Sequence, residues 1–384
     1  KVPFKIFDKK NAEKLFGKNL NISASQLEKF NLCRFSYFCN YGLNVRERQR
    51  AEINPMQYGT IVHYILERFF GEYTKEEYLS LEEDKFQKIV CAYLAEYAVK
   101  YFGEEQLESN SFTYRLKTIL DNVMYLMKHI MEELSQSEFF VADCELKIGE
   151  DIPSYTIVLP DGHKIAVCGS VDRVDIMQRA DITYLRIIDY KTGTKQFKLS
   201  DILYGINLQM LLYLHSIEAS GGDKYGEIVP AGILYMPATV PYISSDSLKS
   251  IDKLPDELNK KLKMNGLLLK DTEIIHGMDK TDVATYIPVK IKAGEPVSST
   301  SLATLAEFGK IFKKVDMLIA EMGKNIYNGN IEAKPLKGGH DSCEYCPYDS
   351  VCAYRQSNPI TCFSVDNKTV IEEITNEING KEEE

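Results

Sequence analysis

The sequence has no long apolar run: no stretch approaches the roughly 18 residues that a membrane-spanning helix needs, and no secretory signal peptide opens it. It also lacks the phosphate-binding pattern G-x4-G-K-[S/T], so any ATP-driven motor would lie outside this chain. Positive charge is not in excess either. The net charge is −10, whereas affinity for nucleic-acid phosphates normally comes from Lys and Arg. That total still allows a local basic surface.

What is present is the composition of a globular protein, with 44% apolar and 11% aromatic residues among 384. This length can hold one large domain or two. Because the first residue is Lys1 and not Met, we expect a piece cut from a longer protein. Nine cysteines, an odd number without a secretory context, favour a cytoplasmic protein with free or metal-bound thiols.

The order of patterns predicts an α/β domain with a mixed sheet, because helices come first, then antiparallel-leaning strands, then a helix that crosses to another strand. The segment SQLEKF, with Ser25 and Glu28 as a capping box, predicts a short helix leading into Cys33. Apolar periodicity predicts further helices over 57–70, 75–102, 113–135, 202–218 and 301–329. Strands are predicted over 142–149, 155–160, 164–176, 184–191 and 231–237, with a turn at 159–164.

The segment IIDYKTG, residues 187–193, ends an apolar run with Asp189 and Lys191 two positions apart. Side chains alternate along a strand, so these two point to one face and Tyr190 to the other. Asp172 lies in the preceding strand, and the two strands could bring both carboxylates together. Two such carboxylates need a cation such as Mg²⁺ or Mn²⁺, beside which a lysine can act on a water or a phosphate. The alternative is two surface aspartates and an ion pair at a sheet edge.

Three more polar residues stand within helical patterns. His63 lies between apolar neighbours, where a histidine is either a core residue or an addition to a carboxylate metal site. Gln209 and Tyr213 lie four positions apart on one face of the predicted helix. They are either ordinary polar edges of that helix or residues of a groove beside the metal.

The segment CEYCPYDSVC puts Cys343, Cys346 and Cys352 on one short loop. The C-x2-C turn brings two thiolates to one metal, and a tetrahedral site needs a fourth ligand, which Cys362 or distant Cys33 could supply. Four thiolates suit both zinc and an iron–sulfur cluster, so the ligand count leaves both open.

Taken together, LCRFSYFCNYGL, GTIVHYILERF, GSVDRVD, IIDYKTG, LQMLLYL and CEYCPYDSVC resemble the PD-(D/E)xK nuclease superfamily, over residues from about 21 to 356. The resemblance is to the iron–sulfur branch that includes CRISPR-associated exonucleases and the carboxy-terminal nuclease domain of AddB, a subunit of bacterial AddAB helicase–nucleases. The length and the long insertion look more like the AddB type. The resemblance implies a restriction-endonuclease-like mixed central sheet flanked by helices, with an Fe–S clasp joining the N- and C-terminal segments.

The resemblance also assigns roles. It makes Asp172, Asp189 and Lys191 catalytic, with Gln209 and Tyr213 as the family's Q-x3-Y motif beside them. The implied Mg²⁺ or Mn²⁺ ligands are His63, Asp172, Asp189 and the main-chain carbonyl of Tyr190. A [4Fe–4S] cluster would be held by Cys33, Cys343, Cys346 and Cys352. Val171 stands where many family members have Pro. Arg34, Arg173 and Lys195 lie near the motifs and are candidate DNA contacts.

We therefore expect a lead-in segment over 1–20, a nuclease domain over 21–363 with an insertion at 240–297 and the cysteine loop at 343–352, and a solvated acidic tail over 364–384. The expected function is metal-dependent exonuclease cleavage of DNA, acting on single-stranded ends. The implied partners are an AddA-type subunit and the remainder of an AddB chain, in the processing of double-strand breaks for recombinational repair. The alternatives are a free-standing CRISPR-adaptation nuclease and a catalytically inactive DNA-binding or structural module.

Overall fold

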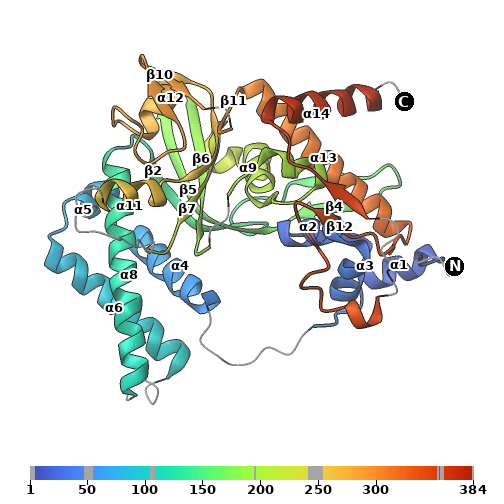
Figure 1. Cartoon of the computed structure of the whole chain (residues 1–384), viewed down its shortest axis with the longest axis horizontal. Helices are drawn as coiled ribbons and strands as arrows, with labels where there is room; N and C mark the ends of the chain where they lie inside the picture. The colour runs from blue at the N-terminus through green and yellow to red at the C-terminus, as the bar shows by residue number, and fades with distance from the viewer. Residues whose placement is uncertain are drawn as a thin grey trace.

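The centre of the chain is a six-stranded mixed sheet with the order β11-β8-β7-β6-β5-β2 (Figure 1). The computed structural model describes residues 5–46, 55–103, 109–193, 196–240, 254–298, 300–352, 354 and 359–382. The sheet's strands are β2 Phe140–Ile148, β5 Gly169–Arg179, β6 Ile182–Lys191, β7 Glu227–Pro237, β8 Asn265–Leu269 and β11 Leu302–Ala303. Pairing is antiparallel from β2 through β5 to β6, parallel from β6 to β7, antiparallel to β8 and parallel to β11. The predicted α/β fold with a mixed sheet is confirmed.

Helices cover both faces of the central sheet. The helix α8 Asn110–Ser135 packs on one face, and α9 Gln209–Ser220, the crossover between β6 and β7, packs on the other. In Figure 1, α8 and its neighbour α6 form a long pair that extends away from the sheet. The other described α-helices are α1 Lys9–Phe16, α2 Ala24–Leu32, α3 Arg34–Tyr37, α4 Pro55–Glu72, α5 Lys75–Leu79, α6 Glu83–Phe102, α10 Gly222–Tyr225, α11 Leu254–Leu262, α12 Thr272–Met278, α13 Leu305–Tyr327 and α14 Asn367–Glu382.

Smaller sheets join parts of the chain that are distant in sequence. The strand β1 Asn19–Ile22 pairs in parallel with β4 Lys164–Val167, which also pairs with β3 Thr156–Val158. Near the C-terminus, β12 Leu336–Gly338 pairs with β13 Ile360–Cys362, and β9 Lys290–Lys292 forms a hairpin with β10 Glu295–Val297. The predicted turn at 159–164 connects β3 and β4.

Two predicted helix starts are wrong. The capping box is formed by Ser23 and Gln26, so Ser25 lies inside α2. The helix predicted over 202–218 begins only at Gln209, after a 3-10 turn over Leu199–Tyr204. Gly205 separates the two: its backbone is left-handed, with φ of 68°, and a Cβ there would lie 2.2 Å from the side-chain nitrogen of Asn31. Glycine therefore ends the turn and lets α2 approach closely.

Two segments have more structure than the sequence suggested. Within 240–297, for which no structure was predicted, β8 joins the central sheet and buries Leu267 and Leu268 completely. The C-terminal segment, expected to be a solvated tail, forms α14 as far as Glu382. Its buried Val370 and Ile374 belong to the main core, so the acidic composition hid an amphipathic helix. In the described part of the chain, no helix is long and apolar enough to cross a membrane.

Candidate active site

The hairpin of β5 and β6 brings Asp172 and Asp189 together. Arg173 pairs with Ile188 in the antiparallel register, so Asp172 and Asp189 form the next cross-strand pair. Asp172 Oδ2 accepts the main-chain N–H of Tyr190 at 2.9 Å, and Lys191 Nζ lies 2.6 Å from Asp189 Oδ2. The predicted alternation is confirmed, because the Tyr190 side chain is buried on the opposite face, where its hydroxyl contacts Arg173.

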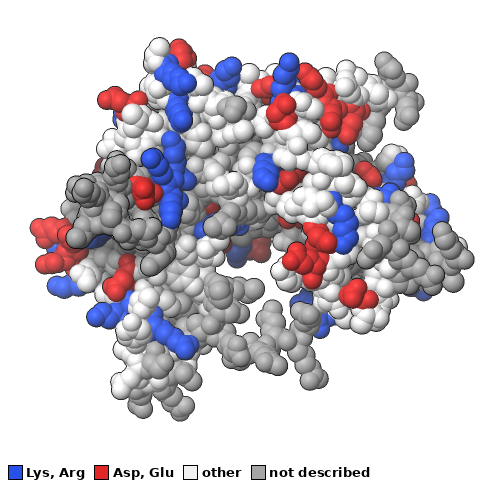
Figure 2. Space-filling view, in the orientation of Figure 1, with Lys and Arg blue, Asp and Glu red and all other residues white. Residues whose placement is uncertain are grey.

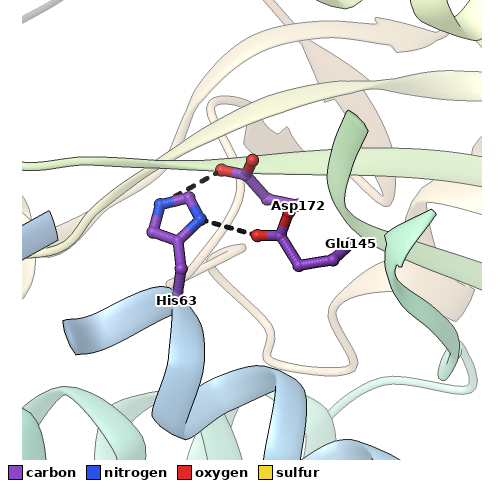
Figure 3. A group of neighbouring side chains, drawn as sticks. All are labelled: His63, Glu145 and Asp172. Carbon is purple, nitrogen blue, oxygen red and sulfur yellow. Dashed lines mark hydrogen bonds and ion pairs between the residues drawn. The ribbon is translucent and has the colours of Figure 1, made fainter. Parts of the chain in front are cut away.

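The helix α4 adds His63, and Figure 3 shows its imidazole between two carboxylates. His63 Nε2 lies 3.6 Å from Asp172 Oδ2, and Nδ1 lies 2.8 Å from Glu145 Oε1. A carboxylate can only accept, so this contact puts the proton on Nδ1 and leaves the Nε2 lone pair toward Asp172. His63, Glu145 and Asp172 each offer one ligand atom within 4.8 Å of the others, an arrangement that could hold a metal ion.

Sequence reasoning missed Glu145, which lies in the middle of β2. Its Oε2 accepts a hydrogen bond from the Ser170 hydroxyl at 2.8 Å while Oε1 meets His63. The backbone of Glu145 is left-handed, with φ of 51°, which is strained for any residue other than glycine. The available signal was modest: Leu146 and Ile148 are the buried face of β2, so Glu145 and Lys147 share the other face, as Asp189 and Lys191 do on β6.

The electrostatics of these groups are those of crowded, half-buried charges. Burial, and next the negative charge of Asp189, raise the pKa of Asp172 to about 7. Burial alone would lower the pKa of His63, but the hydrogen bond to Glu145 and the charge of Asp172 raise it. Burial would raise the pKa of Glu145, yet the hydrogen bonds from His63 and Ser170 lower it. Three carboxylates thus face one ammonium group and one imidazole, an excess of negative charge that a cation would offset.

These groups open onto a cleft of about 680 Å³ whose lining includes His63, Glu145 and Lys191. The predicted residues Gln209 and Tyr213 do not line it. Gln209 is the half-buried first residue of α9, and Tyr213 is only 5% exposed.

Tyr213 lies beneath the start of β5. A Cβ at Gly169 would lie 2.2 Å from the Tyr213 hydroxyl, so the absent side chain makes room for this ring. Tyr213 is close enough to Asp172 for the charge of that carboxylate to raise its pKa, although burial is the larger cause. Its position is that of a support for the strand that carries Asp172.

The family model described as the PD-(D/E)XK nuclease superfamily matches residues 21–353 of this chain. The chain belongs to that superfamily. Its mixed sheet is the fold expected of a PD-(D/E)XK nuclease, and His63, Asp172, Asp189 and Lys191 all lie within the matched residues.

This PD-(D/E)XK nuclease is similar to longer proteins that are named as ATP-dependent helicase/deoxyribonuclease subunits of the AddB type. It is 34% identical over 354 residues to that of Thermoanaerobacter sp. strain X514, covering 89% of this chain and 30% of the relative. The protein of Clostridium kluyveri is 35% identical over 397 residues, with coverage of 99% and 34%. That of Clostridium acetobutylicum is 34% identical over 360 residues, with coverage of 89% and 30%. The chain spans about a third of the length of these curated relatives.

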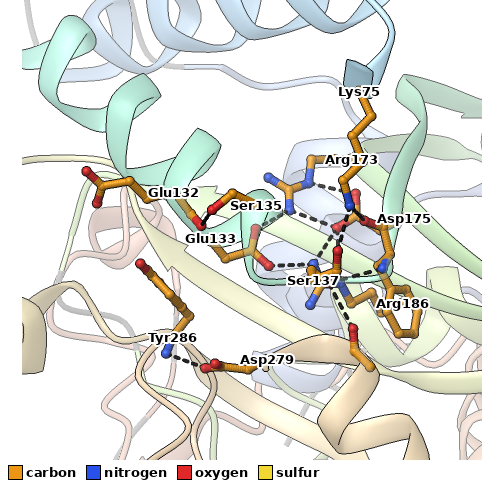
Figure 4. Close-up of polar contacts among 12 residues, drawn as sticks. Lys75, Glu132, Glu133, Ser135, Ser137, Arg173, Asp175, Arg186, Asp279 and Tyr286 are labelled. Atoms are coloured by element: carbon orange, nitrogen blue, oxygen red, sulfur yellow. Dashed lines mark hydrogen bonds and ion pairs between the residues drawn. The ribbon is translucent and has the colours of Figure 1, made fainter. Parts of the chain in front are cut away.

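The prediction that Arg173 contacts DNA is wrong, because its side chain is fully buried under the sheet (Figure 4). Its guanidinium donates to Asp175 at 2.7 and 2.8 Å and to Glu133 of α8 at 3.0 Å. Arg186 donates to the same two carboxylates. The alternation that turns Asp172 toward the cleft turns Arg173 to the opposite face, where two arginines and two acids balance one another.

The other two candidate DNA contacts stand differently. Arg34 forms an ion pair with Glu321 at 3.3 Å and lies over the ring of Phe30, 5.5 Å from its centre. Lys195 lies outside the described residues. Both remain predictions.

The cysteines predicted to act together do meet at one place. A small cavity is lined by Cys33, Cys343, Cys346 and Cys352, which joins the end of α2 to the C-terminal loop. Cys362 lies elsewhere, buried against Ile206 and Leu336. Sequence reasoning overlooked buried Cys39, whose pKa is raised by burial and by the neighbouring Cys346, Cys352 and Cys33.

Proposed function

We propose that this chain is the nuclease unit of a helicase–nuclease, and that it hydrolyses DNA phosphodiesters with Mg²⁺ or Mn²⁺ at the cleft between α4 and β5–β6. The observation that carries this proposal is the convergence of His63, Asp172 and the Asp189–Lys191 pair on one cleft in a PD-(D/E)XK chain. We further propose exonuclease action on single-stranded ends during recombinational repair in the cytoplasm. The remainder of an AddB chain and an AddA-type subunit would supply the motor.

The residues fit a divalent metal. Asp172 and Asp189 are nearly buried side by side, and their repulsion, with burial, raises the pKa of Asp172. Oxygen donors of this kind suit Mg²⁺ and Mn²⁺. The ligands would be the Asp172 and Asp189 carboxylates, His63 Nε2 and the Tyr190 carbonyl. A metal bound there would lower the pKa of a water and stabilise charge on the phosphate.

The side chains around this site then have separate tasks. Glu145 holds the imidazole of His63 in one tautomer, as an acidic partner of a metal-bound histidine commonly does. Lys191, anchored by Asp189 and partly exposed to the cleft, is placed to orient the attacking water or to offset charge developing on phosphorus. Together these side chains would hold one phosphodiester and the water that attacks it.

We also propose a [4Fe–4S] cluster at Cys33, Cys343, Cys346 and Cys352. These four residues line one cavity, which supports the set over one that includes Cys362. Among the described residues, no three cysteine sulfurs lie within 4.8 Å of one another. A single tetrahedral zinc with bonds of about 2.3 Å requires sulfurs about 3.8 Å apart, so the wider spacing favours a larger group.

The nuclease proposal is tested with end-labelled single- and double-stranded DNA in Mg²⁺, Mn²⁺ and EDTA. The parent should cut with metal and stop in EDTA, whereas Asp189→Ala and Lys191→Ala should lose cleavage while keeping the fold by circular dichroism. Asp181→Ala is the matched control, since it removes an exposed aspartate from the far end of the same hairpin. Activity within a few-fold of the parent in either cleft variant would refute the assignment.

The cluster proposal is tested by purification without oxygen. The parent should be brown and carry about four irons per chain. Cys33→Ala should lose iron and stability, whereas Cys91→Ala and Cys39→Ala should retain iron. Stoichiometric zinc, or full iron content in Cys33→Ala, would contradict the proposal.

A further inference from the structure

A row of tyrosines lines the cleft beside the proposed metal site. Besides His63, Glu145 and Lys191, the lining includes Tyr64 of α4 and Tyr97 and Tyr101 of α6. The ring centres of Tyr64 and Tyr97 are 5.2 Å apart, and those of Tyr97 and Tyr101 are 4.4 Å apart with planes inclined by 36°. We call these three residues the tyrosine shelf.

The shelf is anchored at its inner end and open at its outer end. Tyr97 is 5% exposed, and the half-buried Tyr64 donates its hydroxyl to Glu96 at 2.8 Å. Tyr101, by contrast, is 56% exposed, although a ring of this size in a soluble protein usually gains from burial. Core packing therefore accounts for Tyr97 but leaves the exposed ring of Tyr101 without a structural reason.

The charge beside the shelf suits a nucleotide. Lys100 Nζ lies 5.2 Å from the centre of the Tyr101 ring, and Lys147 and Lys191 line the same cleft. A strand whose phosphate reached Lys191 would carry its neighbouring bases along the cleft wall. Aromatic rings in grooves with positive charge are the usual stacking platforms for unpaired bases, because every base has a flat apolar face.

We propose that the tyrosine shelf binds unpaired bases of a single DNA strand, with Tyr101 as the principal stacking ring, and so directs one strand to the cleft. In a duplex, neighbouring base pairs already cover these faces, so the shelf discriminates in favour of single strands. This inference rests on the proposed nuclease function and names the substrate form that the same cleft prefers.

The test measures binding of a fluorescent single-stranded oligonucleotide by anisotropy, in an Asp189→Ala background that keeps the DNA intact. Tyr101→Ala should weaken binding by about fivefold or more, the range expected for a stacked base. Tyr101→Phe should bind like the parent, because it keeps the ring. Tyr114→Ala is the matched control: Tyr114 is 73% exposed on α8 and does not line the cleft.

A second arm varies the DNA. An abasic site at one or two positions should weaken binding to the parent by a similar factor, and should weaken binding to Tyr101→Ala no further. Equal binding by Tyr101→Ala and Tyr114→Ala, an equal loss in Tyr101→Phe, or indifference to abasic sites would each overturn the proposal. Cleavage by the parent with these outcomes would refute the shelf alone. A shelf that behaves as expected in a parent without metal-dependent cleavage would refute the nuclease function alone.

Discussion

Glu145 offers a prediction in which metal binding and stability separate. Replacing it removes the acceptor that lies 2.8 Å from His63 Nδ1, so the imidazole loses its fixed tautomer and orientation. Loss of such an acidic partner typically weakens metal binding about 10- to 100-fold, or about 1.4–2.7 kcal/mol. We expect Glu145→Gln, Glu145→Ala and Glu145→Gly all to show this loss when Mn²⁺ binding is measured by calorimetry.

Stability should rank the last two variants in an unusual order. In a strand, Gly is normally less stable than Ala by about 0.5–1 kcal/mol. Because the left-handed backbone at φ of 51° costs a non-glycine residue about 1–2 kcal/mol, Glu145→Gly should instead resist urea at least as well as Glu145→Ala. Glu67→Gln is the control, since it removes a negative charge from the lining of the same cleft. The reasoning is refuted if Glu67→Gln weakens Mn²⁺ binding as much as Glu145→Gln does, or if Ala is clearly the more stable replacement.

Two further predictions concern the rest of the domain. Glu133→Leu should lower the free energy of unfolding by about 3–5 kcal/mol, because two buried arginines would share one carboxylate, whereas Glu132→Leu, at the exposed neighbouring position on α8, should change it little; similar urea midpoints would contradict this. Burial would lower the pKa of His215, but its bonds to Asp316 and Glu218 raise it to about 9. The histidine therefore stabilises the fold fully below about pH 6.5, and about 2 kcal/mol should be lost as the pH rises to 9. His215→Gln should lack this component of the pH dependence, and parallel pH profiles for parent and variant would rule it out.

The sequence could predict features that depend on local periodicity. Asp189 and Lys191 had to share a face because strand side chains alternate, and the short connection from β5 to β6 then set Asp172 beside Asp189. The same rule, applied to Arg173, would have turned it away from the cleft. In α14, the spacing of Val370, Ile374 and Ile378 is helical and could have been recognised despite the acidic residues around it.

Other features depend on tertiary contacts that no local pattern encodes. Glu145 reaches His63 from a separate strand, and its left-handed backbone has no signature in the residues around it. Tyr213 matches a motif, yet its burial follows from the absence of a side chain at Gly169, 44 positions away. The tyrosine shelf joins α4 to α6, so its rings become neighbours only once these helices pack together.

The central claim is that a divalent metal binds between α4 and the β5–β6 hairpin. The most direct test is a crystal structure of the anaerobically purified protein soaked in Mn²⁺, with anomalous scattering to locate the ion. The account predicts a peak about 2.0–2.6 Å from the Asp172 and Asp189 carboxylates and His63 Nε2, and no such peak in Asp189→Ala. A parent crystal without a peak there, or a main peak away from His63 and Asp172, would contradict it.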